Sequence, residues 1–191
     1  MKIVLASTSP YRKQLLERFQ FPFVTARPET DETAHPGEPP AALAERLAID
    51  KARAISETLE HALVIGSDQV AYMGTEIFGK PGTVERAIAQ LTRMSGHEVI
   101  FHTAVALINA DTKRVQCEGV VTRVRFRTLS DDEIRRYIDA EMPLDCAGSA
   151  KSEGLGITLL DALAGDDPTA LIGLPLIALS RMLRAEGVLL P

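Results

Sequence analysis

The sequence predicts an α/β fold built on one mixed sheet, and three observations support this prediction. Short apolar strands alternate with segments of helical periodicity along most of the chain. Two long strand-like segments, residues 97–109 and 115–127, flank the turn Asp111–Lys113 and indicate an antiparallel hairpin. The 191 residues are 46% hydrophobic and 25% charged, without repeats, low-complexity tracts or long linkers. We therefore expect one globular domain over residues 1–191, with any lobes sharing a core.

The N-terminal part should consist of a strand, a helix and an acidic loop. Residues 2–6 form a short apolar run, which predicts a strand. Ser9 and Pro10 suit the N-cap and the first position of a helix. Residues 28–40 contain four prolines, one glycine and several carboxylates, so we expect an exposed loop there.

After this loop the alternation continues, and turn or capping residues delimit the elements. Ser130 and Glu133, for example, fit a capping box. The predicted elements are a helix over residues 41–59, a buried strand over 62–72, a turn over 74–81, a helix over 84–94, the hairpin, a helix from Ser130, and a last helix over 174–186 before Gly187.

Charge and composition exclude several classes of protein. The 21 Lys and Arg residues and 26 Asp and Glu residues give a net charge of −5, which disfavours nucleic acid as a partner. No apolar run reaches the roughly 18 residues of a membrane span, and the apolar stretch at the start is too short for a signal peptide. We expect a cytoplasmic protein with no membrane partner, in which Cys117 and Cys146 are ordinary reduced thiols.

Asp68 lies in the middle of an apolar strand, where a carboxylate is costly. A buried carboxylate needs a metal ion, a cation or several N–H donors around it. Gly66, two residues earlier on the same face, should leave space beside Asp68 for something large. The alternative is a structural carboxylate that pairs with one arginine or caps a neighbouring helix.

Lys51 interrupts an apolar stripe on the helix predicted over residues 41–59. The stripe follows four-residue spacing and should face the core. Lys51 either extends its ammonium group to solvent along this surface or points it into a cleft, towards a phosphate. The members of the stripe are Leu43, Leu47, Lys51, Ile55 and Leu59.

The turn after the first strand, Ser7–Arg12, has the chemistry of an anion site. It offers hydroxyls, N–H groups and the positive end of a helix dipole, although many such capped helices bind nothing. Residues 1–27 hold five Lys or Arg against one Glu, a net charge of +4. The loop that follows adds Glu29, Asp31 and Glu32. Cations for phosphate beside carboxylates for magnesium suit a metal–nucleotide substrate.

Three motifs of other enzyme classes are incomplete. Residues 74–81 match a P-loop until Pro81, which replaces the hydroxyl residue that holds magnesium. His97 and His102 are one residue too far apart for a zinc-protease pair, and Ser152 lacks the first glycine of a nucleophile elbow. Lys80 remains either a cation on a defined turn or an ordinary surface group.

Eight short motifs stand in a fixed order along the chain. Each alone is a weak signal, but the ordered set is specific. They are LASTSPYR at residues 5–12, DET at 31–33, DKA at 50–52, GSDQ at 66–69, GKP at 79–81, CAGS at 146–149, KSEG at 151–154 and GLP at 173–175. Over essentially its whole length the chain thereby resembles the Maf family of nucleotide pyrophosphatases.

The resemblance implies an ITPase-like fold with an elongated mixed sheet, flanking helices and a cleft between two lobes, often as a homodimer. It also implies cleavage of a nucleoside triphosphate to the monophosphate and pyrophosphate with Mg²⁺ or Mn²⁺. By motif, the site residues are the general base Asp68, the phosphate-binding Ser7, Arg12, Lys51 and Lys80, and the metal ligands Glu32 and Asp68.

Tyr11, Gln69 and Glu153 resemble the subfamily that hydrolyses 7-methyl-GTP. Methylation at N7 makes guanine cationic, which favours a carboxylate at its donor edge and an aromatic ring stacked on it. Glu153 could accept from the N1–H and N2–H₂ groups, and Tyr11 could stack. The alternatives are a solvated loop charge for Glu153 and plain helix packing for Tyr11.

We therefore expect an enzyme that converts the small-molecule nucleotide 7-methyl-GTP to 7-methyl-GMP and pyrophosphate. Asp68 would either deprotonate the water that attacks the α-phosphorus or orient it as a metal ligand. The same reaction on dTTP and UTP is the nearest alternative. A second alternative is a non-catalytic nucleotide sensor linked to septum formation.

Overall fold

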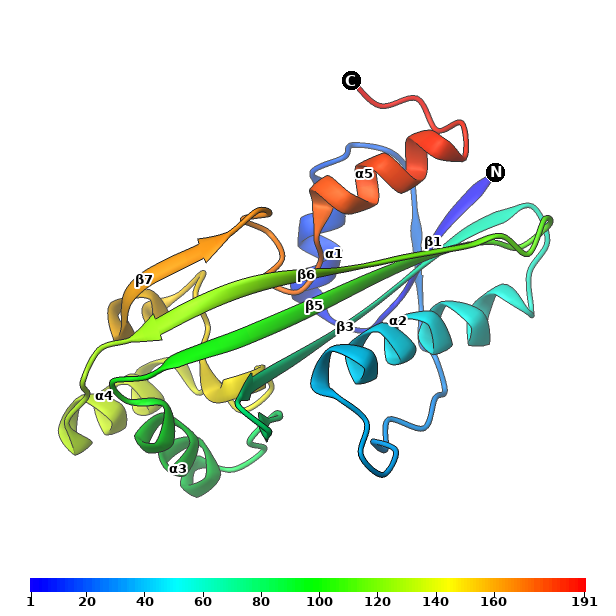
Figure 1. The fold of residues 1–191 in the computed structure, drawn as a ribbon. Coiled ribbons are helices and arrows are strands. Elements are labelled where there is room, and N and C mark those ends of the chain that lie inside the picture. The colour runs from blue at the N-terminus through cyan, green and yellow to red at the C-terminus, as the bar shows by residue number, and fades with distance from the viewer.

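The computed structural model describes residues 1–191 and contains one mixed sheet of seven strands (Figure 1). The strand order is β2-β1-β3-β5-β6-β7, and β4 pairs with the end of β3. β1 is parallel to β2 and β3, whereas every other pair is antiparallel. The predicted α/β class with a mixed, elongated sheet is confirmed. The strands are β1 (Lys2–Ala6), β2 (Val24–Ala26), β3 (Ala62–Met73), β4 (Glu76–Phe78), β5 (Glu98–Asn109), β6 (Val115–Phe126) and β7 (Leu160–Gly165).

Five α-helices and two short 3₁₀ turns complete the fold. The predicted caps are present: Ser9 accepts from the backbone N–H of Arg12, and Ser130 and Glu133 form a reciprocal capping box. The helical elements are α1 (Pro10–Glu17), α2 (Pro40–Ser56), α3 (Val84–Met94), α4 (Asp131–Glu141), η1 (Ala147–Ser149), η2 (Leu155–Leu159) and α5 (Leu176–Ala185).

Helices cover both faces of the sheet at the end that contains the two termini (Figure 1). α2 packs on one face through Leu43, Leu47 and the small residues Ala48 and Ala52. α1 and α5 pack on the opposite face against the side chains that point the other way from β1, β3 and β5. This arrangement follows from the alternation of side chains along each strand, which gives both faces of the inner strands apolar residues.

The long strands carry the sheet to a second hydrophobic cluster at its other end. β3, β5 and β6 each have 12 residues and so extend about 40 Å. There α3 and α4 pack around Phe101 and Phe126. Asp68 lies midway along β3, on the face that packs against α2, between Val64 and Val70 of the first cluster.

Three short strands were not predicted. β2 and β4 have three residues each, too few to show an alternating pattern. β7 has the sequence LDALAG, which lacks β-branched residues, and five of its six residues are exposed. It is a strand because it pairs with the edge of β6, a tertiary effect that local sequence does not reveal.

None of the helices combines the length and apolar character that a membrane span requires.

Candidate active site

A cavity of about 840 Å³ lies between the first turn of α1, the loop before α2, the middle of β3 and the segment that leads into η1. All nine residues that the sequence nominated line this one cavity. They are Ser7, Tyr11, Arg12, Glu32, Lys51, Asp68, Gln69, Lys80 and Glu153. The cavity therefore joins segments that are far apart in the chain.

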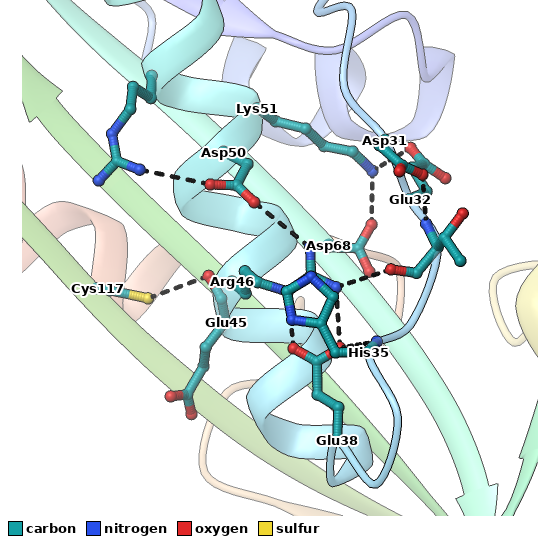
Figure 2. A network of polar contacts seen from close by, with 12 residues as sticks. Asp31, Glu32, His35, Glu38, Glu45, Arg46, Asp50, Lys51, Asp68 and Cys117 are labelled. Carbon is teal, nitrogen blue, oxygen red and sulfur yellow. Dashed lines mark hydrogen bonds and ion pairs between the residues drawn. The ribbon is translucent and has the colours of Figure 1, made fainter.

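Lys51 is the centre of the polar network in this cavity. Its Nζ lies 2.6 Å from Oδ1 of Asp68 and 2.7 Å from Oε1 of Glu32 (Figure 2). Lys51 and Asp68 are 7% and 8% exposed, so this is a buried ion pair at the cavity wall. The alternative in which Lys51 extends to bulk solvent is wrong. Instead, the apolar stripe of α2 places the ammonium group directly over the strand.

Gly66 does not leave open space beside Asp68, and that expectation is corrected. A Cβ atom at this position would lie 2.1 Å from the carbonyl oxygen of Ala48 and 2.7 Å from the backbone nitrogen of Ala52. The absence of a side chain lets α2 approach the backbone of β3. This close packing is what brings Lys51 within bonding distance of Asp68.

The pairing of Asp68 agrees in part with the structural alternative raised from the sequence. The carboxylate does have a cationic partner, although that partner is a lysine. However, the protein donates to Oδ1 alone, and the pair lines a cavity. Because the pair borders the cavity, a ligand in the cavity can reach it. The pair therefore serves both the packing of α2 on β3 and the binding of a ligand.

Arg12 is held in the cavity by the loop that precedes α5. Its Nε donates to the carbonyl oxygen of Gly173 at 2.8 Å, and Ser67 Oγ donates to the same oxygen at 2.9 Å. Gly173 has a φ of +126°, a conformation that favours glycine. Burial lowers the pKa of the Arg12 guanidinium, and the charges of Asp68 and Glu32 partly oppose this.

Glu32 is positioned among cations. Burial acts to raise its pKa, but the hydrogen bond from Lys51 and the charges of Lys51, Lys80 and Arg12 outweigh burial and lower the pKa below its usual value. Glu32 is therefore ionised at neutral pH. This end of the cavity, which we call the phosphate end, comprises Ser7, Arg12, Glu32, Lys51, Asp68 and Lys80.

The donor set at the phosphate end fits a hard divalent cation that shares its coordination with a substrate. Glu32 and Asp68 are bridged by the same lysine nitrogen, so their oxygens are near each other. No group of three or more His, Cys, Asp or Glu residues is arranged to hold a metal ion. Mg²⁺ is usually bound by one or two carboxylates that are completed by phosphate oxygens and water, so two carboxylates suffice.

The opposite end of the cavity, which we call the base end, has different chemistry. It comprises Tyr11, Asp145, Cys146 and Glu153. Burial and the charge of Asp145 raise the pKa of Cys146 to about 12, so the thiol is neutral. The ammonium group of Lys151 lies 5.6 Å from the centre of the Tyr11 ring. The ammonium group of Lys151 therefore covers one face of the Tyr11 ring.

Gln69 points away from the ion pair, because successive strand residues face opposite sides of the sheet. Its amide nitrogen donates to Thr103 Oγ1 at 2.8 Å and to the carbonyl oxygens of Ala170 and Leu171 at 3.1 and 2.9 Å. The amide nitrogen has no further hydrogen to offer a ligand. Gln69 thus fixes the segment that leads to Gly173 and Arg12.

Among the cavity residues that sequence reasoning did not nominate, three are polar or contribute a backbone contact to the site: Arg27, Asp145 and Gly173. Gly173 belongs to the GLP motif, but nothing local indicates that its carbonyl oxygen anchors an arginine 161 positions away. Asp145 precedes the CAGS motif and could have been found as a further acidic residue near Glu153. Arg27 was counted only in the positive charge of residues 1–27.

Comparison with known proteins identifies the family. The family model described as Maf-like protein matches residues 2–186. The chain belongs to the Maf family. The resemblance that the ordered motifs predicted is confirmed. The match spans β1 to the end of α5 and so includes every residue that lines the cavity.

Several Maf relatives are similar over nearly their full length. A protein of Aromatoleum aromaticum named 7-methyl-GTP pyrophosphatase is 71% identical, with 100% of this chain and 98% of the relative covered. Proteins with the same name from Burkholderia thailandensis and Polaromonas sp. are 59% and 56% identical, over 97% and 98% of this chain and 88% and 86% of the relatives.

A solved structure of a nucleoside-triphosphatase, described as a dITP/XTP pyrophosphatase, from Mycobacterium abscessus aligns over 100% of both chains. The TM-score is 0.43 and the sequence identity 16%. A likeness at this level carries no weight for the function.

Proposed function

We propose that this chain hydrolyses 7-methyl-GTP to 7-methyl-GMP and pyrophosphate. The observation that carries the proposal is one cavity lined by cations and a strand carboxylate at one end and by an aromatic ring and two carboxylates at the other. The names of relatives that match nearly the whole chain support the same substrate. A triphosphate and a positively charged base on one molecule would match the two ends.

At the phosphate end, the cations would bind the triphosphate and stabilise the charge that develops on it. Arg12 is oriented by Gly173, and Lys80 is an exposed cation on the turn before α3. Ser7 lies in the turn between β1 and α1, just before the N-terminus of the helix, whose dipole favours an anion. Such fixed cations accelerate phosphoryl transfer because they need not reorganise as the charge moves.

Asp68 would act on the water molecule. Its Oδ1 is bound to Lys51, which leaves Oδ2 to accept a hydrogen bond from water. As the water oxygen forms a bond to the α-phosphorus, the bond from that phosphorus to the oxygen bridging to the β-phosphorus breaks. Asp68 takes the water proton, and the leaving group is pyrophosphate.

Glu32 and Asp68 are the residues that would hold Mg²⁺ or Mn²⁺ together with the phosphates. The cation, when bound, would neutralise phosphate charge and polarise the phosphoryl oxygens. Lys51 keeps the two carboxylates together in the protein itself. It thereby prevents the mutual repulsion of two adjacent negative charges.

At the base end, Tyr11 would stack on the methylated guanine, while Glu153 and Asp145 would favour its positive charge. Burial raises the pKa of Tyr11, as do Cys146 and Asp145, so the ring remains a neutral phenol. A uracil or thymine edge presents two carbonyl acceptors, which a carboxylate would repel. The base end therefore favours 7-methyl-GTP over dTTP and UTP.

Hydrolysis in ¹⁸O-labelled water tests the reaction. We expect 7-methyl-GMP carrying one labelled oxygen, with unlabelled pyrophosphate as the second product. Label in the pyrophosphate would contradict attack at the α-phosphorus. Formation of 7-methyl-GDP and phosphate would contradict the reaction type, and binding without any product would favour the nucleotide sensor.

A further inference from the structure

Arg46, on the outer side of α2, makes contacts that none of the functions above uses. Its Nε and Nη2 donate to the two oxygens of Glu38 at 2.7 and 2.8 Å, a bidentate pair. Nη2 also donates to the carbonyl oxygen of Thr33 at 3.0 Å. Figure 2 shows this cluster beside the Lys51 network. A single guanidinium group therefore fixes two separate points of the loop that contains Glu32.

The loop over residues 27–39 depends on such anchors, because it contains no helix or strand. Its own hydrogen bonds are short-range: Asp31 accepts from the N–H of Thr33 at 2.9 Å, and Glu38 accepts from the N–H of His35 at 3.0 Å. Residues 31–37 are all exposed, so no hydrophobic packing holds them in place. The loop is therefore held mainly by its polar contacts to α2.

Glu32 has little else to hold it. Its side chain is 61% exposed, and its ion pair with Lys51 is shared with Asp68. The neighbouring residue, Thr33, is the one whose carbonyl oxygen Arg46 binds. The same helix thus holds this stretch twice, with Lys51 on the inner side and Arg46 on the outer side.

The Arg46–Glu38 pair also differs from an ordinary surface ion pair. The two side chains are 22% and 9% exposed. The hydrogen bond from Arg46 is the main cause that lowers the pKa of Glu38 to about 2, so the pair stays ionised across the neutral range. Arg53, two turns further along α2, provides a contrast: its side chain is 51% exposed and makes one contact, at 3.5 Å, to Asp50.

We propose that Arg46 is a positioning residue for the active site, which orders the loop over residues 27–39 so that Glu32 faces Lys51 and Asp68. The proposal rests on the function proposed above, because it assigns Glu32 to the phosphate end. Arg46 touches no substrate; it acts through the backbone at Thr33 and the carboxylate of Glu38. A displacement of Glu32 by about 1 Å is enough to reduce turnover strongly.

The test compares Arg46→Gln with the matched control Arg53→Gln. Hydrogen–deuterium exchange of the 27–39 segment is measured on the metal-free, nucleotide-free protein. We expect exchange to quicken about fivefold or more in Arg46→Gln and to change less than about twofold in Arg53→Gln. Turnover of 7-methyl-GTP should fall about tenfold or more in Arg46→Gln alone, mainly in kcat. Unchanged exchange in Arg46→Gln would overturn the proposal.

A double-mutant cycle with Glu32→Gln separates positioning from a general loss of stability. If Arg46 acts through Glu32, Arg46→Gln reduces turnover by less than about twofold in the Glu32→Gln background. If Arg46→Gln still reduced turnover about tenfold in the Glu32→Gln background, Arg46 would not act through Glu32, and the proposal would be contradicted. Arg46→Lys, which keeps the charge but not the bidentate geometry, should recover only part of the turnover and serves if Arg46→Gln does not fold. If the wild-type protein does not turn over 7-methyl-GTP, the proposed function fails, and the exchange experiment still decides whether Arg46 orders the loop.

Discussion

The two ends of the cavity are built differently. Half of the phosphate end comes from regular elements: Lys51 from the middle of α2, Asp68 from the middle of β3, and Arg12 from the first turn of α1. Its other members, Ser7, Glu32 and Lys80, lie in loops. The base end takes only Tyr11 from a helix, and its other members, Asp145, Cys146 and Glu153, lie in the irregular segment around η1. The buried Lys51–Asp68 pair and the close packing of α2 fix the centre of the first end, whereas the second depends on a segment in which Asp145 and Glu153 are exposed.

This difference suggests a division of labour. Groups that act on the reacting phosphate must be held rigidly, so helices and a central strand are suited to carry them. Groups that choose a base can vary with little effect on the reaction, so a loop is suited to carry them. Substitutions at the phosphate end should therefore reduce turnover of every nucleotide, and those at the base end should change the preference among nucleotides.

The largest effect is expected at Asp68. Asp68→Asn keeps the size of the side chain and can still accept from Lys51, but it cannot take a proton from water. We expect kcat for 7-methyl-GTP to fall by about 10²- to 10⁴-fold. Steady-state kinetics measures the loss, and circular dichroism with a thermal melt controls for folding. Wild-type turnover in a folded Asp68→Asn protein would show that Asp68 is not the general base.

A smaller but uniform effect is expected at Lys80. This residue is exposed, so Lys80→Met should leave the melting temperature nearly unchanged. Loss of one cation at the triphosphate should reduce kcat/KM about tenfold to a hundredfold. The same factor should hold for 7-methyl-GTP, GTP and dTTP. A loss of kcat/KM for only one of the three nucleotides would place Lys80 at the base end. It would contradict the distinction between the two ends of the cavity.

Glu153→Gln should instead change selectivity. The substitution removes a carboxylate that we propose to accept from the guanine edge, at a cost of about tenfold in kcat/KM for 7-methyl-GTP. Turnover of dTTP should stay within about twofold or rise. Parallel assays of both nucleotides on the same preparation measure the ratio. If the ratio of kcat/KM for 7-methyl-GTP to that for dTTP did not change, Glu153 would be a solvated loop charge that does not contact the base.

The smallest effect is expected at Cys146. Because burial and Asp145 raise the pKa of this thiol to about 12, it carries no charge at neutral pH. Cys146→Ser exchanges one neutral group for another of similar size, so kcat/KM should change less than about threefold. A loss beyond tenfold would show that the thiol takes part in binding or in the reaction.

The sequence alone predicted much of the fold and nominated nine residues that line one cavity. Asp68 and Lys51 each stood out because a charged group interrupted an apolar pattern, and both line the cavity. That the two charges pair with each other could not be predicted, because the pairing depends on the approach of α2 over the bare backbone at Gly66. The separation of Lys51 and Asp68 along the sequence does not indicate that they are in contact.

Other features escaped prediction for related reasons. β7 forms only through its partner strand, and its exposed residues show no apolar pattern. Arg46 looked like one of many charged residues on a helix, because its contacts with Thr33 and Glu38 depend on how the loop folds back. Local sequence predicts elements and unusual residues, whereas tertiary contacts decide their partners.

A competition experiment tests the central claim most directly. Equal concentrations of 7-methyl-GTP, GTP, dTTP and UTP are incubated with the wild-type protein and a divalent cation, and the monophosphates are separated over time. We predict that 7-methyl-GMP forms first, at least about tenfold faster than GMP, dTMP or UMP. Equal rates for all four products, or earlier formation of dTMP and UMP, would contradict the account.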